Sequence, residues 1–181
     1  MKDFPGIIIP YKNAVEIARV CEWFEDDLSV IFNKNHISFF SDTVHITSRL
    51  IDGSFPDYKQ IIPKEEKTKI IILKQDLIQA LKTTTIFTNK FNQITLTVKT
   101  KEKFFSLESK NADVGEGVVA LDAAISGEDV GLNVNMRYFS DCLSHIHHDS
   151  VLISFNGAGR PIVVSGASDA SFTYLVMPMN R

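Results

Sequence analysis

Residues 69–81 read KIIILKQDLIQAL, and this stretch decides the fold. Its apolar run predicts a strand, and the spacing of the apolar residues after Lys74 predicts an amphipathic helix that follows directly. The same order of strand and helix recurs in GIIIPYKNAVEIARV, residues 6–20, and in VGLNVNMRYFSDCL, residues 130–143. The three helices are expected to begin near Lys12, Lys74 and Asn135, so the unit repeats at a period of roughly 60 residues.

Alternating apolar stretches follow each helix and predict strands. They lie at 28–33, 36–40 and 44–50 after the first helix, at 93–99, 104–109 and 117–122 after the second, and at 151–155, 161–166 and 172–178 after the third. Many α+β folds share this order of elements without an internal repeat. Three copies in the same order nevertheless favour an α+β fold built from three repeated units, each a helix with antiparallel strands.

Each predicted helix has an apolar stripe and a polar face. The stripes consist of Ala14, Ile17, Ala18 and Cys21 in the first helix, Leu77, Ala80 and Leu81 in the second, and Phe139, Cys142, Leu143 and Ile146 in the third. We expect the stripes to pack on the strands, which leaves basic side chains pointing outward at Lys12, Arg19, Lys82 and Arg137. Such faces could contact nucleic acid, although an ordinary solvated helix face has the same composition.

Composition narrows the class of protein. The net charge of −3 does not suggest DNA binding over the whole surface, although a local basic face stays possible. The chain has no apolar run long enough to span a bilayer and no visible signal peptide, so we expect a cytoplasmic protein that does not bind membranes. Cys21 and Cys142 fall among apolar residues of predicted helices, which is typical of buried thiols rather than of a disulfide or a nucleophile.

No enzyme signature is present, since the sequence lacks a phosphate-binding glycine loop, a paired-cysteine metal motif and a nucleophile elbow. His145, His147 and His148 come nearest to a metal site, but on a continuous helix only His145 and His148 would share a face. Histidines at the C-terminal end of a helix are the simpler interpretation. We therefore expect a non-catalytic protein without a metal or another cofactor.

Two local segments carry more information. RLIDGSFPDYKQIIP, residues 49–63, combines an Asp-Gly turn with an extended Phe-Pro link into the next strand. FTYLVMPMNR, residues 172–181, runs from a strand into two methionines around a proline, which predicts a soft, adaptable apolar surface.

These segments resemble the bacterial sliding clamp family, the beta subunit of DNA polymerase III. LIDGSFPDY with the following IIP resembles the most distinctive stretch of that family, and LVMPM resembles its ending. IFTNKF, residues 86–91, is similar to its third-domain helix exit, and Asn135 and Tyr138 resemble its asparagine-x-x-tyrosine at a helix start. The resemblance extends from about Ile7 to the last residue.

The resemblance implies a particular architecture. Clamp subunits contain three similar domains of two such repeats each, and two subunits close head to tail into a homodimeric ring with helices around duplex DNA. Residues 1–58 would be the second half of the middle domain and residues 59–181 the complete third domain. We accordingly expect a fragment, whether an engineered truncation, an internal start or a split gene.

The implied function is that of a processivity factor in DNA replication. The ring would encircle duplex DNA without reading its sequence, and Lys12, Arg19, Lys82 and Arg137 would face the DNA. The replicative polymerase, the clamp loader and repair proteins would insert short apolar peptides into a pocket. The alternative is a stand-alone peptide-binding module that tethers partners and forms no ring.

The resemblance also assigns the residues of the peptide pocket. They are Pro56, Gln60, Ile61, Phe91, Asn135, Tyr138, Pro161, Leu175, Met177, Pro178 and Met179. The sequence departs from the family at Gln60, where many relatives carry arginine, and in the IFTNKF loop, which is one residue short and leaves the position of Phe91 less certain.

Overall fold

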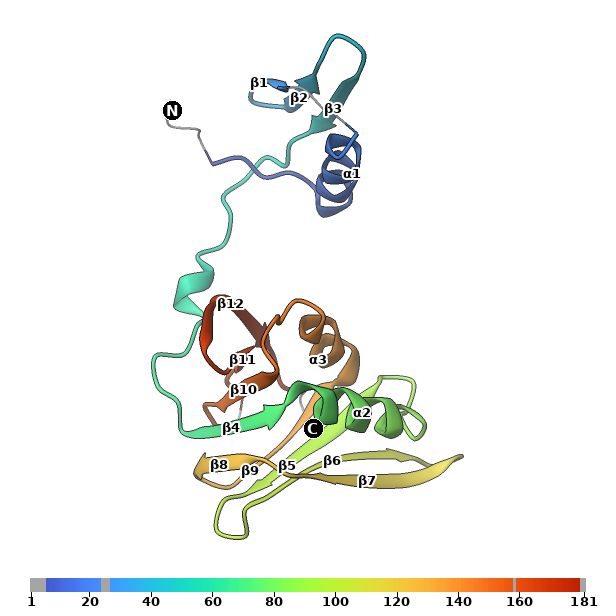
Figure 1. Cartoon of the computed structure of the whole chain (residues 1–181), viewed down its shortest axis with the longest axis vertical. Coiled ribbons are helices and arrows are strands. Elements are labelled where there is room, and N and C mark those ends of the chain that lie inside the picture. The colour runs from blue at the N-terminus through green and yellow to red at the C-terminus, as the bar shows by residue number, and fades with distance from the viewer. Residues whose placement is uncertain (1–5, 24–26, 158, 180–181) are drawn as a thin grey trace. The chain divides into compact units, whose positions relative to one another are not determined.

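The structure is a computed structural model, and it describes residues 6–23, 27–157 and 159–179. The chain divides into two compact units, Met1–Asp57 and Tyr58–Arg181. Figure 1 shows the elements of each unit. Within the described residues, no helix has the length and apolar character needed to cross a membrane.

The first unit is one helix with a three-stranded antiparallel sheet. Its elements are α1 (Tyr11–Cys21), β1 (Ser29–Phe32), β2 (His36–Phe40) and β3 (His45–Arg49), and the strand order is β1-β2-β3. The segment before α1 is held to the end of the sheet by a hydrogen bond of 2.8 Å from the N–H of Ile51 to the carbonyl of Ile8.

The second unit contains the other two repeats. The first of them comprises β4 (Thr68–Leu73), α2 (Lys74–Thr85), β5 (Gln93–Lys99), β6 (Phe104–Asn111) and β7 (Gly115–Leu121). The other comprises β9 (Val130–Asn135), α3 (Met136–Leu143), β10 (Ser150–Phe155), β11 (Ile162–Gly166) and β12 (Asp169–Val176). The 3-10 turn η1 (Tyr58–Gln60) precedes them, and β8 (Ala124–Gly127) lies between them.

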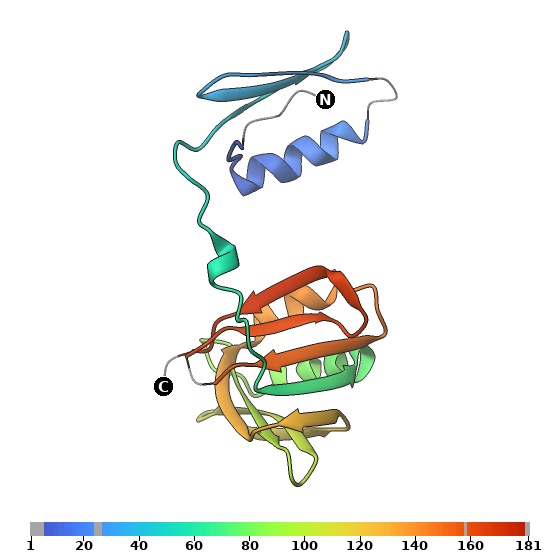
Figure 2. The ribbon, with the colours of Figure 1, turned by 90° about the vertical axis from the view of Figure 1, so that its left-hand side faces the viewer.

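The two repeats of the second unit exchange their first strands. β4, which leads into α2, pairs with β10 of the other repeat, and β9, which leads into α3, pairs with β5. The resulting sheets have the orders β12-β11-β10-β4-β8 and β7-β6-β5-β9. Figure 2 views the five-stranded sheet with both helices behind it. Each repeat therefore completes the sheet of the other.

One continuous core fills the second unit. Its largest fully buried side chains include Phe105, Phe139 and Phe155, and the apolar stripes predicted for α2 and α3 are buried in it. The α+β architecture of antiparallel helix-plus-strand units predicted from the sequence is confirmed for these repeats.

Four details differ from the prediction. The apolar run at residues 6–9 predicts a strand, but these residues form none. The third helix ends at Leu143, so Ile146 is buried from the following turn and not from the helix. β8 was not expected, because Ala124–Gly127 is too short to show an alternating pattern. The apolar stripe of α1 is buried only at Ile17, since no second helix covers Ala14 and Ala18 among the described residues of the first unit.

Candidate functional site

The C-terminal segment connects the two sheets of the second unit. β12 is an edge strand of the five-stranded sheet and ends at Val176. The chain then passes through Met177 and Pro178, and the N–H of Met179 donates a hydrogen bond of 2.7 Å to the carbonyl of Asn133 on β9, in the four-stranded sheet. Met177 is 57% exposed. This crossing places two flexible thioether side chains between two groups of predicted site residues.

The first group lies beside the start of β11. Gln60, Ile61 and Pro161 line one groove of about 420 Å³. Ile162 pairs with Val176, so Pro161 and Met177 occupy neighbouring register positions. Leu175 pairs with Val163 one step further along the same two strands. The structure thus brings five predicted residues to one edge of the second unit.

The second group surrounds the N-terminus of α3. Asn135 caps this helix, because its Oδ1 accepts a hydrogen bond of 2.9 Å from the N–H of Arg137. The Nδ2 of Asn135 donates at 3.2 Å to the carbonyl of Phe91. Phe91 and Tyr138 are both more than half exposed, and Asn89 holds the loop by accepting a hydrogen bond of 2.9 Å from the N–H of Phe91. One asparagine therefore positions both the helix and the aromatic loop.

Two aromatic residues near this surface were missed by the sequence. Tyr174 and Phe172 stack on β12, with ring centroids 6.3 Å apart, and His145 lies 6.0 Å from Phe172. Burial raises the pKa of Tyr174, and the neighbouring Cys142, Asp141 and Tyr138 raise it further. The alternation of Phe172 and Tyr174 along the strand is the signal that could have placed them on one face.

The remaining predicted pocket residue, Pro56, belongs to the first unit, where it is exposed. The other ten predicted residues all belong to the second unit. The assignment of all eleven residues to a peptide pocket stays a prediction.

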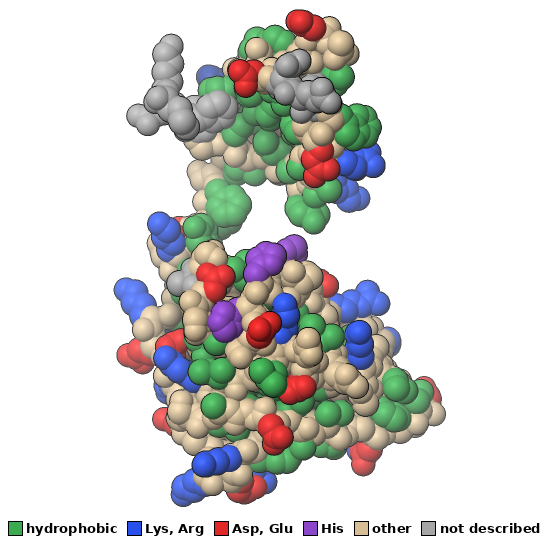
Figure 3. All heavy atoms as spheres, in the orientation of Figure 1, with side chains coloured by type: hydrophobic (Ala, Val, Ile, Leu, Met, Phe, Trp, Pro, Cys, Tyr) green, Lys and Arg blue, Asp and Glu red, His purple; other side chains and the backbone are tan. Residues whose placement is uncertain are grey.

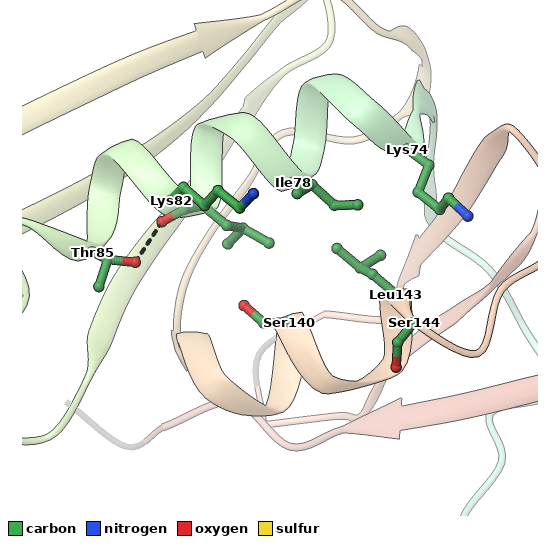
Figure 4. Close-up of a pocket in the computed structure, with 8 residues that line it drawn as sticks. Lys74, Ile78, Lys82, Thr85, Ser140, Leu143 and Ser144 are labelled. Carbon is green, nitrogen blue, oxygen red and sulfur yellow. Dashed lines mark hydrogen bonds between the residues drawn. The ribbon is translucent and has the colours of Figure 1, made fainter.

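A separate groove of about 410 Å³ lies between α2 and α3 (Figure 4). Ile78, Leu81 and Leu143 line it with apolar side chains, and Lys74 and Lys82 line it with two cationic side chains. The Nζ of Lys74 donates a hydrogen bond of 2.7 Å to the carbonyl of Ile146. The sequence predicted an outward role for Lys82 but did not identify Lys74, which it took only as the start of the helix.

The remaining predicted DNA-facing residues lie at other helix positions. Thr85 Oγ1 contacts Met136 Sδ at 2.9 Å, so the end of α2 adjoins the start of α3, where Arg137 is exposed. In the first unit Lys12 and Arg19 are exposed on α1. Arg19 forms an exposed ion pair of 2.6 Å with Glu16, which reduces its net attraction for an anion.

The histidines do not form a metal site among the described residues. No group of three or more histidine, cysteine or carboxylate side chains in this part of the chain could hold a metal ion. His148 Nδ1 instead accepts a hydrogen bond of 3.1 Å from the N–H of Ser150, in the turn that leads into β10.

Comparison with known families accounts for both units. The family model for the C-terminal domain of the DNA polymerase III beta subunit matches residues 59–180, and the model for the central domain of the same subunit matches residues 1–57. The chain belongs to the DNA polymerase III beta subunit family. The resemblance stated from the sequence is confirmed.

Individual beta subunits agree with this assignment. The beta sliding clamp of Bacillus subtilis is 26% identical over 177 residues, which cover 96% of this chain and 47% of that protein. The crystal structure of the Bartonella birtlesii sliding clamp bound to griselimycin has a TM-score of 0.87 and 27% identity, and covers 98% of this chain and 48% of that one. The structure of the B. subtilis clamp gives a TM-score of 0.84 at 25% identity and covers 99% of this chain and 49% of that one.

These comparisons confirm the clamp fold as well as the family. The chain spans about half the length of the beta subunits that it matches. Those relatives are named as sliding clamps, and both family models are those of a DNA polymerase III subunit.

Proposed function

We propose that this chain acts in DNA replication as a sliding-clamp processivity factor. It would form part of a ring that encircles duplex DNA, and it would tether the replicative polymerase, the clamp loader and repair proteins. In this proposal residues 1–58 are half of a middle clamp domain and residues 59–181 a complete third domain. The work is topological, so no catalytic group, metal or cofactor is required. The proposal rests on the match to both beta-subunit domain models.

The proposed partner site is the surface around the C-terminal segment. Met177, Ile61, Phe91 and Tyr138 are each at least 50% exposed although they are apolar or aromatic. Exposed apolar side chains of this kind suit the leucine and phenylalanine anchors of a short peptide, and methionine adapts to anchors of different shape. The griselimycin complex of the Bartonella relative supports a ligand site in this family and supplies a second probe.

The proposed DNA-facing surface is the pair of helices α2 and α3. Lys74 and Lys82 line the groove between them, and Arg137 lies at the start of α3. A few lysines and arginines attract phosphates without reading bases, and such contacts permit sliding. We expect weak, salt-sensitive binding to duplex DNA of any sequence.

Binding of a labelled peptide with leucine and phenylalanine anchors tests the partner site. Replacing Met177 by Ala should weaken binding by about 1–2 kcal/mol, roughly 5- to 30-fold, because one well-packed anchor contact is lost. The control is His147→Ala, an exposed residue with no proposed role. Griselimycin should compete with the peptide. Loss of affinity in the His147 variant with full affinity in the Met177 variant would show that the site lies elsewhere.

A second candidate is a peptide-binding module that tethers partners without enclosing DNA. The location of ten of the eleven proposed pocket residues in the second unit favours it, since one unit then carries most of the site. Gel filtration with plasmid DNA separates the two candidates. A ring should co-elute with closed circular plasmid and slide off linearised plasmid, whereas a peptide-binding module should co-elute with neither form.

A further inference from the structure

The first unit has an uncovered apolar side. Among its described residues only Ile17 and Ile37 are buried hydrophobic side chains, whereas the second unit buries a large core. Tyr11, Val15, Val30 and Ile31 are between 41% and 82% exposed. Figure 3 shows hydrophobic side chains on the surface of this unit. A unit of this size with so little burial is only marginally stable by itself.

The second unit shows how such a side is covered. Its repeats have the same element order as the first unit, and the correspondence extends to single hydrogen bonds. Ile8 and Asn133 each lie three residues before their helix, and each accepts a hydrogen bond from the segment that follows the last strand, from Ile51 and Met179 respectively. Residues 6–10 therefore occupy the place of β9, and β1 occupies the place of β10.

The corresponding strands of the second unit have partners that the first unit lacks. β9 pairs with β5 and β10 pairs with β4, in each case across the repeats. In the first unit β1 is an edge strand, and residues 6–10 form no strand. Within the described part of the chain, the backbone N–H and C=O groups of Ile7 and Ile9 have no hydrogen-bond partner.

The helix repeats this difference. Positions three, six and seven residues after the helix start are buried in both α2 and α3, as Leu77, Ala80 and Leu81 and as Phe139, Cys142 and Leu143. In α1 the same positions are the apolar residues Ala14, Ile17 and Ala18, of which Ala14 and Ala18 are exposed. α2 and α3 pack on each other in antiparallel directions, as Figure 4 shows.

We infer that the first units of two copies of this chain pair through this side into a two-fold symmetric dimer. Each copy offers one helix face, one edge strand and one segment that forms no strand of its own, which is the set that the other copy needs, so the surface is self-complementary. By analogy with β4 and β10, residues 7–10 of one copy pair antiparallel with β1 of the other, and α1 packs on its symmetry mate. This inference depends on the internal repeat and stands apart from the proposed function.

The register of this pairing follows from the second unit. Ile72 pairs with Val151, and Val134 with Ile94, which places the second residue before the helix opposite the second residue of the strand. The equivalent pair is Ile9 of one copy with Val30 of the other. The N–H of Asn33 donates a hydrogen bond of 2.9 Å to the carbonyl of His36, so these two residues form a hydrogen-bonded pair at the end of β1 and β2. Hydrogen-bonded and non-hydrogen-bonded pairs alternate along an antiparallel ladder, and the β1–β2 register places Val30 in a non-hydrogen-bonded pair. The N–H and C=O of Val30 therefore point away from β2. Both backbones thus point their donors and acceptors toward the new partner.

Pro10 is compatible with this arrangement. In the register above, Pro10 lies opposite Ser29. Hydrogen-bonded and non-hydrogen-bonded pairs alternate along an antiparallel ladder, and Pro10 with Ser29 is a non-hydrogen-bonded pair, so no N–H of Pro10 is needed there. The absence of an N–H at Pro10 therefore costs nothing there. Pro10 also suits the strand-to-helix junction, since its carbonyl accepts a hydrogen bond of 2.9 Å from the N–H of Ala14.

Light scattering and hydrogen exchange on the intact chain test the inference. The expected mass is twice the 20.3 kDa of one chain, with slow exchange at the amides of Ile9 and Val30. Ala18→Glu places a charge in the helix contact and should give a monomer with fast exchange at both amides. The matched control Glu16→Ala changes the same helix at the position of the exposed Gln79 and Asp141, and should remain a dimer.

A crosslink provides a second measurement that does not depend on loss of folding. Val15 and Ala18 correspond to Ile78 and Leu81, which line the groove between antiparallel helices. The variant Val15→Cys, Ala18→Cys, Cys21→Ser should form a covalent dimer on mild oxidation and return to monomer with reductant. Light scattering that shows a monomeric chain would overturn the inference. A dimer would also overturn it if Ala18→Glu does not dissociate it, if the amides of Ile9 and Val30 exchange fast in it, and if the crosslink does not form.

Discussion

At the residue scale, the two cysteines show how far sequence reasoning reaches. Both were predicted to be buried in helices, and Cys142 is fully buried on α3. Cys21 occupies the same kind of position at the end of α1 but is only half-buried. Helical periodicity gives the face on which a residue lies, but it does not tell whether another element covers that face.

Thiol reactivity should therefore differ between the two cysteines. Burial raises the pKa of Cys142 to about 12, so its thiol is protonated and also inaccessible, whereas Cys21 is partly exposed. In the Ala18→Glu variant, whose first units should stay unpaired, we expect an aromatic disulfide reagent to modify about one thiol per chain, and mass spectrometry of digests should locate it at Cys21. Equal labelling of Cys142 without denaturant would contradict the structure.

The same thiol predicts a pH dependence of stability. The folded pKa of Cys142 lies above its ordinary value of 9.0, so the unfolded chain loses this proton first as the pH rises. The contribution of the Cys142 thiol to the free energy of unfolding is therefore fully present below about pH 9. It is lost progressively between about pH 9 and about pH 12, by at most roughly 1.4 kcal/mol per pH unit. Urea unfolding across this pH range should show that the free energy of unfolding falls less in Cys142→Ala than in the unchanged protein. The difference between the two decreases measures the contribution of Cys142.

At the scale of elements, β8 shows what a short strand contributes. It pairs antiparallel with β4, and Gly127 lies opposite Thr68. The side chain of Thr68 adds two hydrogen bonds to the neighbouring residue, since its Oγ1 donates to the carbonyl of Glu128 at 2.7 Å and accepts from the N–H of Glu128 at 3.0 Å. The sequence did not predict β8, because four residues show no periodicity and the decisive contacts come from a strand that is distant along the chain.

Gly127 should be essential for this pairing. Its φ is +110°, and a Cβ there would collide with the backbone carbonyl of Lys67 and lie 2.7 Å from the Cα of Thr68. Gly127→Ala should lower the free energy of unfolding of the second unit by about 2 kcal/mol or more, since neither contact is a flexible side chain. Gly131→Ala on β9 is the control, because nothing lies within 4 Å of its Cβ position. Equal unfolding midpoints for the two variants would count against the described β4–β8 pairing.

At the scale of the whole molecule, the repeat was visible in the sequence, but the exchange of strands between repeats was not. The apolar runs at residues 6–9, 69–73 and 130–134 all predict strands, and two of them are strands. The run at 6–9 is not, because in the second unit the partner of each such strand comes from another repeat. Pocket residues such as Met177 and Asn135 came from family resemblance, since no periodicity indicates that β12 and β9 are joined by Met179.

The two units should unfold separately. The first unit has few buried side chains, so it should unfold at lower denaturant than the second, and its midpoint should rise with protein concentration if copies pair. The midpoint of the second unit should not change with concentration. Hydrogen exchange at β2 and at β5 reports the two transitions, and a single transition at both sites would show that the units are coupled.

The hydrogen bond from Met179 to Asn133 has a practical consequence for anyone who attaches a label to this chain. Any peptide continued beyond Met179 starts beside β9, close to Phe91 and Tyr138. An affinity tag or fluorophore there would occupy the surface on which the proposed peptide ligand binds. The tagged protein would then bind the peptide weakly because of the tag and would be scored as inactive. Reporters are better placed in the turn around Lys101, at the far end of β5, where the chain is exposed and no proposed ligand is bound.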